Sequence, residues 1–84
     1  MIFSDWRRLT ENEVRMAKQV FADSIDFHHI KIYRGIPLIP NANTAIAPNG
    51  NIYFPRKHCP DDFTQAGIAY KIWLIHELTH VWQH

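Results

Sequence analysis

The chain has 84 residues, of which 46% are apolar, and nine basic side chains nearly balance eight acidic ones. This length suits one small domain, and the apolar content excludes intrinsic disorder. The formal charge of +1, with no basic cluster, argues against nucleic acid or a membrane surface as partner. No stretch is apolar enough for a signal peptide or a membrane span, so we expect a chain that is cytoplasmic as synthesised.

The first half of the chain predicts a helix followed by a strand. Thr10 and Glu13 form the T-x-x-E pattern of a helix capping box, and apolar residues then recur at helical spacing. The spacing predicts a helix over residues 11–23. Residues 27–33 (FHHIKIY) are rich in β-branched and aromatic side chains, which favours a strand.

The second half predicts a hairpin and a final helix. Ala45–Ala47 and Ile52–Phe54 flank a Pro-Asn-Gly-Asn turn, and from residue 63 or 68 onward only Gly67 disfavours a helix. The predicted class is therefore α+β, with one helix, a small twisted sheet that contains a hairpin, and a last helix. We expect residues 1–84 to form a single domain.

The last helix carries His76-Glu77-Leu78-Thr79-His80, the His-Glu-x-x-His pattern. Residues four apart lie one turn apart on the same side of a helix, so both imidazoles can reach one Zn²⁺ ion. Glu77 flanks this side and can act as general base toward water. The pattern predicts a zinc site with His76 and His80 as ligands and Glu77 as the catalytic residue.

The alternative is that the pattern arises by chance on a solvated helix face in a chain with six histidines. The flanking residues Ile75, Leu78, Val81 and Trp82 suit a half-buried helix better than an exposed one. The context therefore favours the metal site.

The segment HELTHVWQ, preceded by NGNIYFP, resembles the zincin metallopeptidases in their gluzincin-like form. It is similar to the zincin domains of Vgr-related and Rhs-associated bacterial proteins linked to type VI secretion. The resemblance covers Ala45 to Gln83. It implies zinc-dependent hydrolysis of peptide bonds in a peptide or protein substrate. It also implies a secretion-system partner, export by a type VI system, and an edge strand that pairs with extended substrate, formed here by Ile52, Tyr53 and Phe54.

A zincin site also has a third protein ligand, which in gluzincins is a glutamate on a later helix. We expect the domain to continue beyond residue 84, so that this form binds zinc poorly and hydrolyses little. His84 is a second candidate, because it extends the row of His76 and His80, but the last helical turn would have to unwind. The remaining candidates are a second copy of the chain in a homodimer, or an upstream side chain among His28, His29, His58 and Cys59.

A competing function is a non-catalytic, zincin-like structural or delivery module of a secretion-system effector. Glu77 favours the hydrolase, because a scaffold needs no general base. A closed structural zinc site is disfavoured, because such sites use four ligands with paired cysteines and Cys59 is the one cysteine of the chain. An ordinary buried thiol is the simplest role for Cys59.

Overall fold

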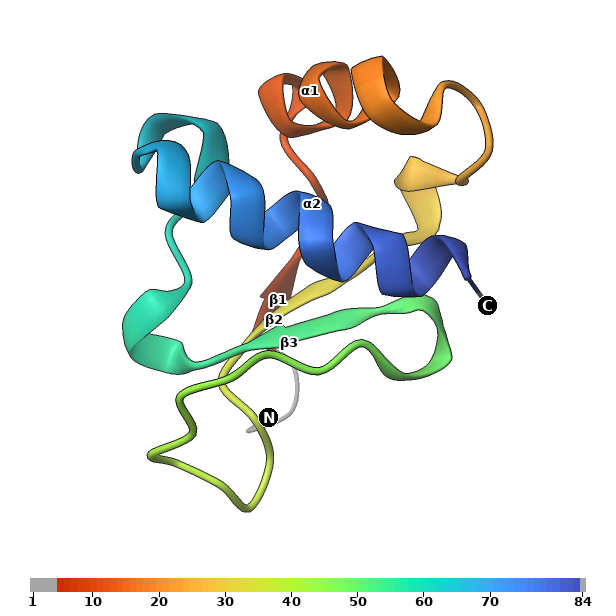
Figure 1. Cartoon of the computed structure of the whole chain (residues 1–84). Coiled ribbons are helices and arrows are strands. Elements are labelled where there is room, and N and C mark those ends of the chain that lie inside the picture. Colours follow the sequence, from red (N-terminus) through yellow and green to blue (C-terminus); the bar gives the residue numbers. More distant parts are fainter. Residues whose placement is uncertain (1–4, 84) are drawn as a thin grey trace.

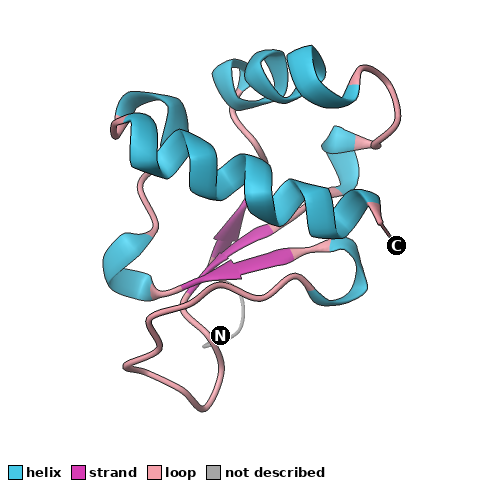
Figure 2. Cartoon of the chain, viewed as in Figure 1, coloured by secondary structure: helices cyan, strands magenta, loops and turns pink. Residues whose placement is uncertain are grey.

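The computed structural model describes residues 5–83, which form a three-stranded sheet and two α-helices. The strands are β1 (Trp6–Arg7), β2 (Ile32–Arg34) and β3 (Ile52–Phe54), and they lie side by side in that order (Figure 2). β1 runs antiparallel to β2, and β2 runs parallel to β3. The predicted α+β class is confirmed.

The two helices are α1 (Glu11–Phe21) and α2 (Ile68–Trp82). Figure 1 shows α2 lying across one side of the sheet, with α1 beyond it. Neither helix is long and apolar enough to cross a membrane. The predicted capping box starts α1, since Thr10 Oγ1 accepts a hydrogen bond from the Glu13 N–H at 3.1 Å and Glu13 Oε1 accepts one from the Thr10 N–H at 2.8 Å.

The strand predicted over residues 27–33 is wrong for most of its length. Residues Phe27–His29 form a 3₁₀ turn, and only the end of the predicted stretch enters β2. Phe27 and Ile30 are both buried. Residues three apart lie on the same side of a 3₁₀ turn, so this conformation buries both where a strand would point them to opposite faces.

The predicted hairpin is reduced to a single antiparallel bridge between Ile46 and Tyr53. A 3₁₀ turn, Pro48–Gly50, joins the two sides, with Asn49 in the left-handed region at φ 55°. The strand partner of β3 is β2 in parallel, which the local pattern did not indicate.

The core lies between α2 and the sheet. Leu74 and Leu78 of α2 are fully buried, and the Trp73 ring meets Phe54 of β3 edge-on at 5.1 Å between centroids. Phe63, just before α2, packs against the same Phe54 ring at 4.4 Å. These contacts fix how α2 sits on the sheet and which of its sides faces outward.

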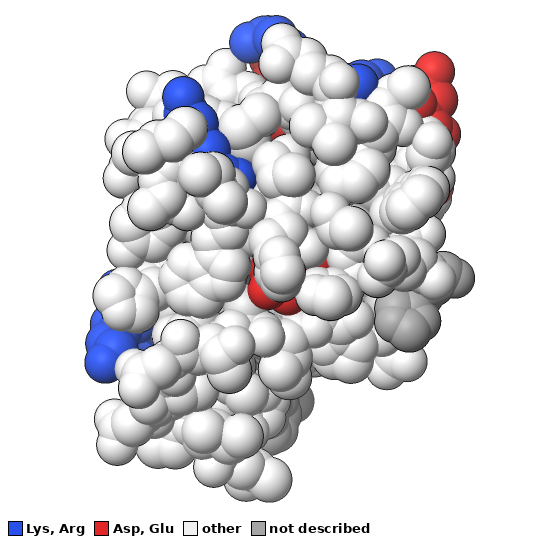
Figure 3. Space-filling model, in the orientation of Figure 1, with Lys and Arg blue, Asp and Glu red and all other residues white. Residues whose placement is uncertain are grey.

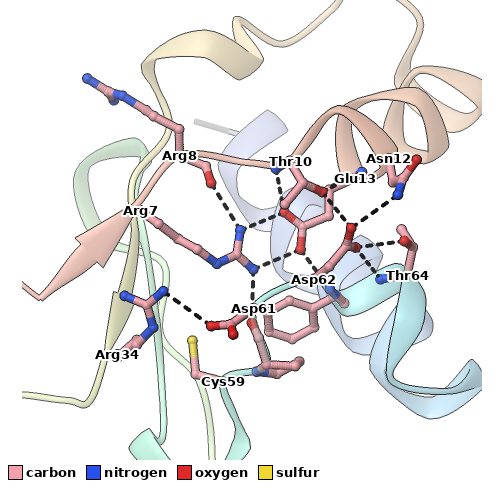
Figure 4. A network of polar contacts seen from close by, with 12 residues as sticks. Arg7, Arg8, Thr10, Asn12, Glu13, Arg34, Cys59, Asp61, Asp62 and Thr64 are labelled. Carbon is pink, nitrogen blue, oxygen red and sulfur yellow. Dashed lines mark hydrogen bonds and ion pairs between the residues drawn. The ribbon is translucent and has the colours of Figure 1, made fainter.

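A buried ion pair joins β1, α1 and the segment that leads into α2 (Figure 4). Arg7 donates from its two terminal nitrogens to the two carboxylate oxygens of Glu13, each at 2.8 Å. The Phe63 N–H donates to Glu13 at 2.8 Å, and Arg7 donates to the Pro60 carbonyl at 3.0 Å. Burial opposes ionisation of Arg7, but Glu13 raises the pKa of the guanidinium above its ordinary value.

Asp62 extends this network toward α2. Its carboxylate accepts hydrogen bonds from the N–H and the hydroxyl of Thr64, from the Thr10 hydroxyl, and from the Asn12 amide. Burial opposes ionisation, but these bonds lower the pKa of Asp62. The network therefore holds the residues before α2 against the first turn of α1.

Candidate functional site

His76 and His80 lie side by side on α2 with both side chains exposed. Their Nε2 atoms are 3.2 Å apart, and the ring centroids are 4.8 Å apart at an interplanar angle of 83°. The helix produces this pair directly, because residues four apart project from adjacent turns. The structure thus brings the two predicted ligands together.

The separation of the two Nε2 atoms suits a shared metal ion. Two nitrogens that each lie 2.0–2.1 Å from a tetrahedral ion are about 3.3–3.4 Å apart. The distance in the structure is 3.2 Å, so the pair fits two corners of such a site with almost no movement. The same distance also suits a hydrogen bond between the two imidazoles.

Glu77 is 5% exposed, and no hydrogen bond or ion pair reaches its carboxylate within residues 5–83. It lies on the side of α2 that turns toward the body of the domain, next to His76 in sequence. Among the described residues, the fully buried side-chain polar atom that lacks a hydrogen-bond partner is Arg7 Nε, and the Glu77 oxygens are not in that class. Glu77 therefore combines a largely covered side chain with a carboxylate that is not committed to another group of the described chain.

The structure does not bring a third ligand to this pair among the residues it describes. No group of three or more histidine, cysteine or acidic side chains within residues 5–83 is placed to hold a metal ion. His84 lies outside the described residues.

The upstream candidates have other surroundings. His58 Nδ1 lies 3.0 Å from the Tyr70 hydroxyl. Tyr70 precedes His76 on α2 by about 1.7 helical turns. His29 pairs with Asp26. Cys59 lies 4.0 Å from the Tyr33 carbonyl, and burial raises the pKa of its thiol. An ordinary half-buried thiol remains the simplest reading of Cys59.

The three residues expected to pair with substrate form β3, but much of that strand is already occupied. The Ile52 and Phe54 side chains are fully buried. The Tyr53 N–H donates to the Ile46 carbonyl at 2.8 Å, and the Tyr53 carbonyl accepts from the Ile46 N–H at 3.0 Å. Substrate binding by this strand stays a prediction, and an extended peptide would have to displace Ile46 to reach the centre of β3.

A cavity of about 480 Å³ lies on the face of the sheet away from α2. Its floor includes Tyr33 and Tyr53, whose rings stack at 4.3 Å between centroids, and Arg34 and Arg56 stand at its rim. Burial raises the pKa of Tyr53. Since neighbouring residues of a strand point to opposite faces, Tyr53 points away from the face that holds α2 and the histidine pair. No pattern discussed above predicts this cavity, although the apolar segment between Pro37 and Pro40 helps to line it.

Comparison with known proteins shows that the chain is similar to a secretion protein. No family model matches the chain. The chain is 38% identical over 81 residues to the type VI secretion system spike protein VgrG2b of Pseudomonas aeruginosa, a match that spans 93% of the chain and 8% of that protein. A solved structure, the effector domain of P. aeruginosa VgrG2b, superposes with a TM-score of 0.82 at 37% identity over 93% of the chain and 45% of that domain.

These findings correct the assignment to the zincin peptidases. The relatives are named as a spike protein and its effector domain, no peptidase family model matches, and the described residues assemble no three-ligand metal site. The Vgr-related part of the expectation and the link to type VI secretion are confirmed. The chain is thus similar in sequence and fold to somewhat less than half of the effector domain of a type VI secretion spike protein.

Proposed function

We propose that this chain acts as part of a type VI secretion effector domain, carried out of the cell by a spike protein of the VgrG kind. The observation that carries the proposal is the match to the VgrG2b effector domain over 93% of the chain at a TM-score of 0.82. Because the chain spans only 8% of the spike protein, the carrier would be a separate polypeptide or a further part of a longer one. The secretion apparatus is the partner that this proposal names.

The experiment is an exchange of segments. This chain replaces the matched segment of P. aeruginosa VgrG2b, and the growth of recipient bacteria attacked by the chimera is compared with growth under attack by the native spike protein. The proposal expects the chimera to reproduce the effect of the native effector domain in strains with a working type VI apparatus. A chimera that is released but has no effect on recipients would contradict it.

A second candidate function, zinc-dependent hydrolysis of amide bonds in a peptide or protein, is supported by one specific observation. The exposed Nε2 atoms of His76 and His80 are 3.2 Å apart, and Glu77, which follows His76 in α2, makes no hydrogen bond or ion pair within residues 5–83. His76 and His80 would hold the ion, which when bound lowers the pKa of water and polarises a carbonyl group. Glu77 would accept a proton from water and hand it to the leaving amine.

The substitution Glu77→Gln separates the two candidates, because it keeps the shape of the side chain and removes its basicity. In the chimera described above, the hydrolase predicts that Glu77→Gln abolishes the effect on recipients. A non-catalytic module predicts that the variant acts like the parent. Release of the spike protein into the medium, measured in parallel, confirms that both versions are delivered.

A further inference from the structure

The outward side of α2 carries a ridge of residues four apart: Ile68, Ile72, His76 and His80. Ile68 is 70% exposed and Ile72 is 63% exposed, and both histidines are exposed as well. The two halves of the ridge differ in their side-chain chemistry. Its first half is aliphatic, and its second half is the imidazole pair.

The surface around this ridge carries few charges. Figure 3 views the molecule from the side on which α2 lies, and most of that face is white, with acidic atoms near its centre and a basic side chain toward the upper left. On α2 itself, Lys71 lies next to Ile72 and is half-buried. Ala69, beside the ridge, is exposed and small, so another backbone can approach closely there. Single exposed isoleucines are ordinary, but Ile68 and Ile72 are neighbours on adjacent turns of one helix, and adjoining exposed apolar residues are typical of a contact surface.

α2 is also apolar on its inner side, through Leu74 and Leu78. A helix that is apolar on opposite sides is typical of one enclosed between two layers. In residues 5–83 only one layer is present, because the sheet packs on the inner side of α2.

The matched structure indicates what the second layer is. The chain corresponds to 45% of the solved effector domain, so more than half of that domain has no counterpart in residues 1–84. That remaining part must share a surface with the region equivalent to this chain. The outward side of α2, with Ile68 at 70% and Ile72 at 63% exposure, is the candidate for that surface.

We infer that Ile68, Ala69 and Ile72 form a docking surface for an apolar helix from the remaining part of an effector domain of the VgrG2b kind. A helix is the expected occupant because a ridge of residues four apart fits the groove between the corresponding ridges of a second helix. A helix seated on the aliphatic half would leave His76 and His80 at its border, where it would form one wall of the histidine site. The inference rests on the proposed relationship to an effector domain and not on metal binding.

The test compares one substitution in two contexts, this chain alone and the chimera in which it replaces the matched segment of the VgrG2b effector domain. Ile72→Asp places a charge on the proposed surface. In the isolated chain the residue faces solvent, so the folding equilibrium constant should change little. In the chimera the same substitution should lower that constant by at least about a further tenfold, because it buries a charge and removes aliphatic contact. Urea unfolding followed by tryptophan fluorescence measures both.

Ile39→Asp is the matched control, since Ile39 is also an isoleucine, is 55% exposed, and lies on the loop between β2 and β3, away from α2. Its effect should be the same in both contexts. Equal effects of Ile72→Asp in the two contexts would overturn the inference, as would a chimera that fails to fold. Light scattering adds one further outcome, since an isolated chain that forms a dimer lost in Ile72→Asp would assign the surface to a second copy instead. The effect on recipient cells is read separately, so failure of the docking surface is distinguishable from failure of the proposed function.

Discussion

Two glutamates of this small domain are buried in helices, and their surroundings are opposite. Glu13 of α1 is fully buried and accepts hydrogen bonds from both terminal nitrogens of Arg7, from the Phe63 N–H and from the Thr10 N–H. Glu77 of α2 is 5% exposed and has no such partner within residues 5–83. Each oxygen of the Glu13 carboxylate accepts two hydrogen bonds, whereas the Glu77 carboxylate accepts none from the described residues.

The difference teaches how to separate structural from functional burial of charge. The Glu13 pair connects β1, α1 and the segment before α2, so its role is explained completely by the contacts it makes. Glu77 makes no such contact within the described chain, and its oxygens are not among the fully buried atoms that lack a partner. The hydrolase proposed above would give Glu77 a role as general base, whereas the contacts of Glu13 leave no room for one.

The largest expected effect is at Glu13. Glu13→Gln leaves the buried Arg7 guanidinium without its counter-charge and should lower the free energy of unfolding by about 3 kcal/mol or more. Urea unfolding at pH 7 measures the change. Glu11→Gln, at an exposed position in the first turn of the same helix, is the control and should change the free energy by less than about 0.5 kcal/mol. A small effect of Glu13→Gln would show that the ion pair does not organise the fold.

The second prediction contrasts Glu77 with Glu13. Glu77→Gln removes the charge of a carboxylate that makes no hydrogen bond or ion pair within residues 5–83, so without metal it should not lower the free energy of unfolding. The measurement is the same urea titration in the presence of a chelator. A clear loss of stability would mean that Glu77 has a stabilising partner, and the contrast with Glu13 would disappear.

A smaller effect than at Glu13 is expected at Asp62, which caps the turn before α2. Its folded-state pKa is lowered below the ordinary value of 3.8, so its contribution is present above pH 3.8 and is lost as the pH falls through the lowered folded pKa. Asp62→Ala should lower the free energy of unfolding by about 1 kcal/mol at pH 7, and the difference from the parent should shrink below pH 3.8. Denaturant titrations from pH 2 to pH 7 test this. A difference that stays constant down to pH 2 would contradict the assigned role.

Local patterns predicted the parts of the fold whose causes are local. The start of α1 follows from the Thr10–Glu13 capping box, and the pairing of His76 with His80 follows from helix periodicity alone. The turn at Phe27–His29 was missed because β-branched and aromatic composition favours a strand, while burial of Phe27 together with Ile30 requires a spacing of three.

Other features depend on residues that are distant in sequence. The parallel pairing of Ile32–Arg34 with Ile52–Phe54 joins segments about 20 residues apart, and no local signal indicates it. The exposure of Ile68 and Ile72 was likewise hidden, because their helical spacing reads as a core-facing stripe, whereas the core-facing residues are Leu74 and Leu78. A pattern of residue types locates a helix more reliably than it decides which side of that helix is covered.

The measurement that tests the central claim most directly is a calorimetric zinc titration of the purified chain beside His76→Ala and, as a matched control, His29→Ala at another exposed histidine. We predict one weak site, well short of the roughly 10–16 kcal/mol of complete structural zinc sites, that is lost in His76→Ala and kept in His29→Ala. Zinc binding that is equal in all three proteins, or absent from the parent chain, would contradict the proposal that His76 and His80 can hold a metal ion.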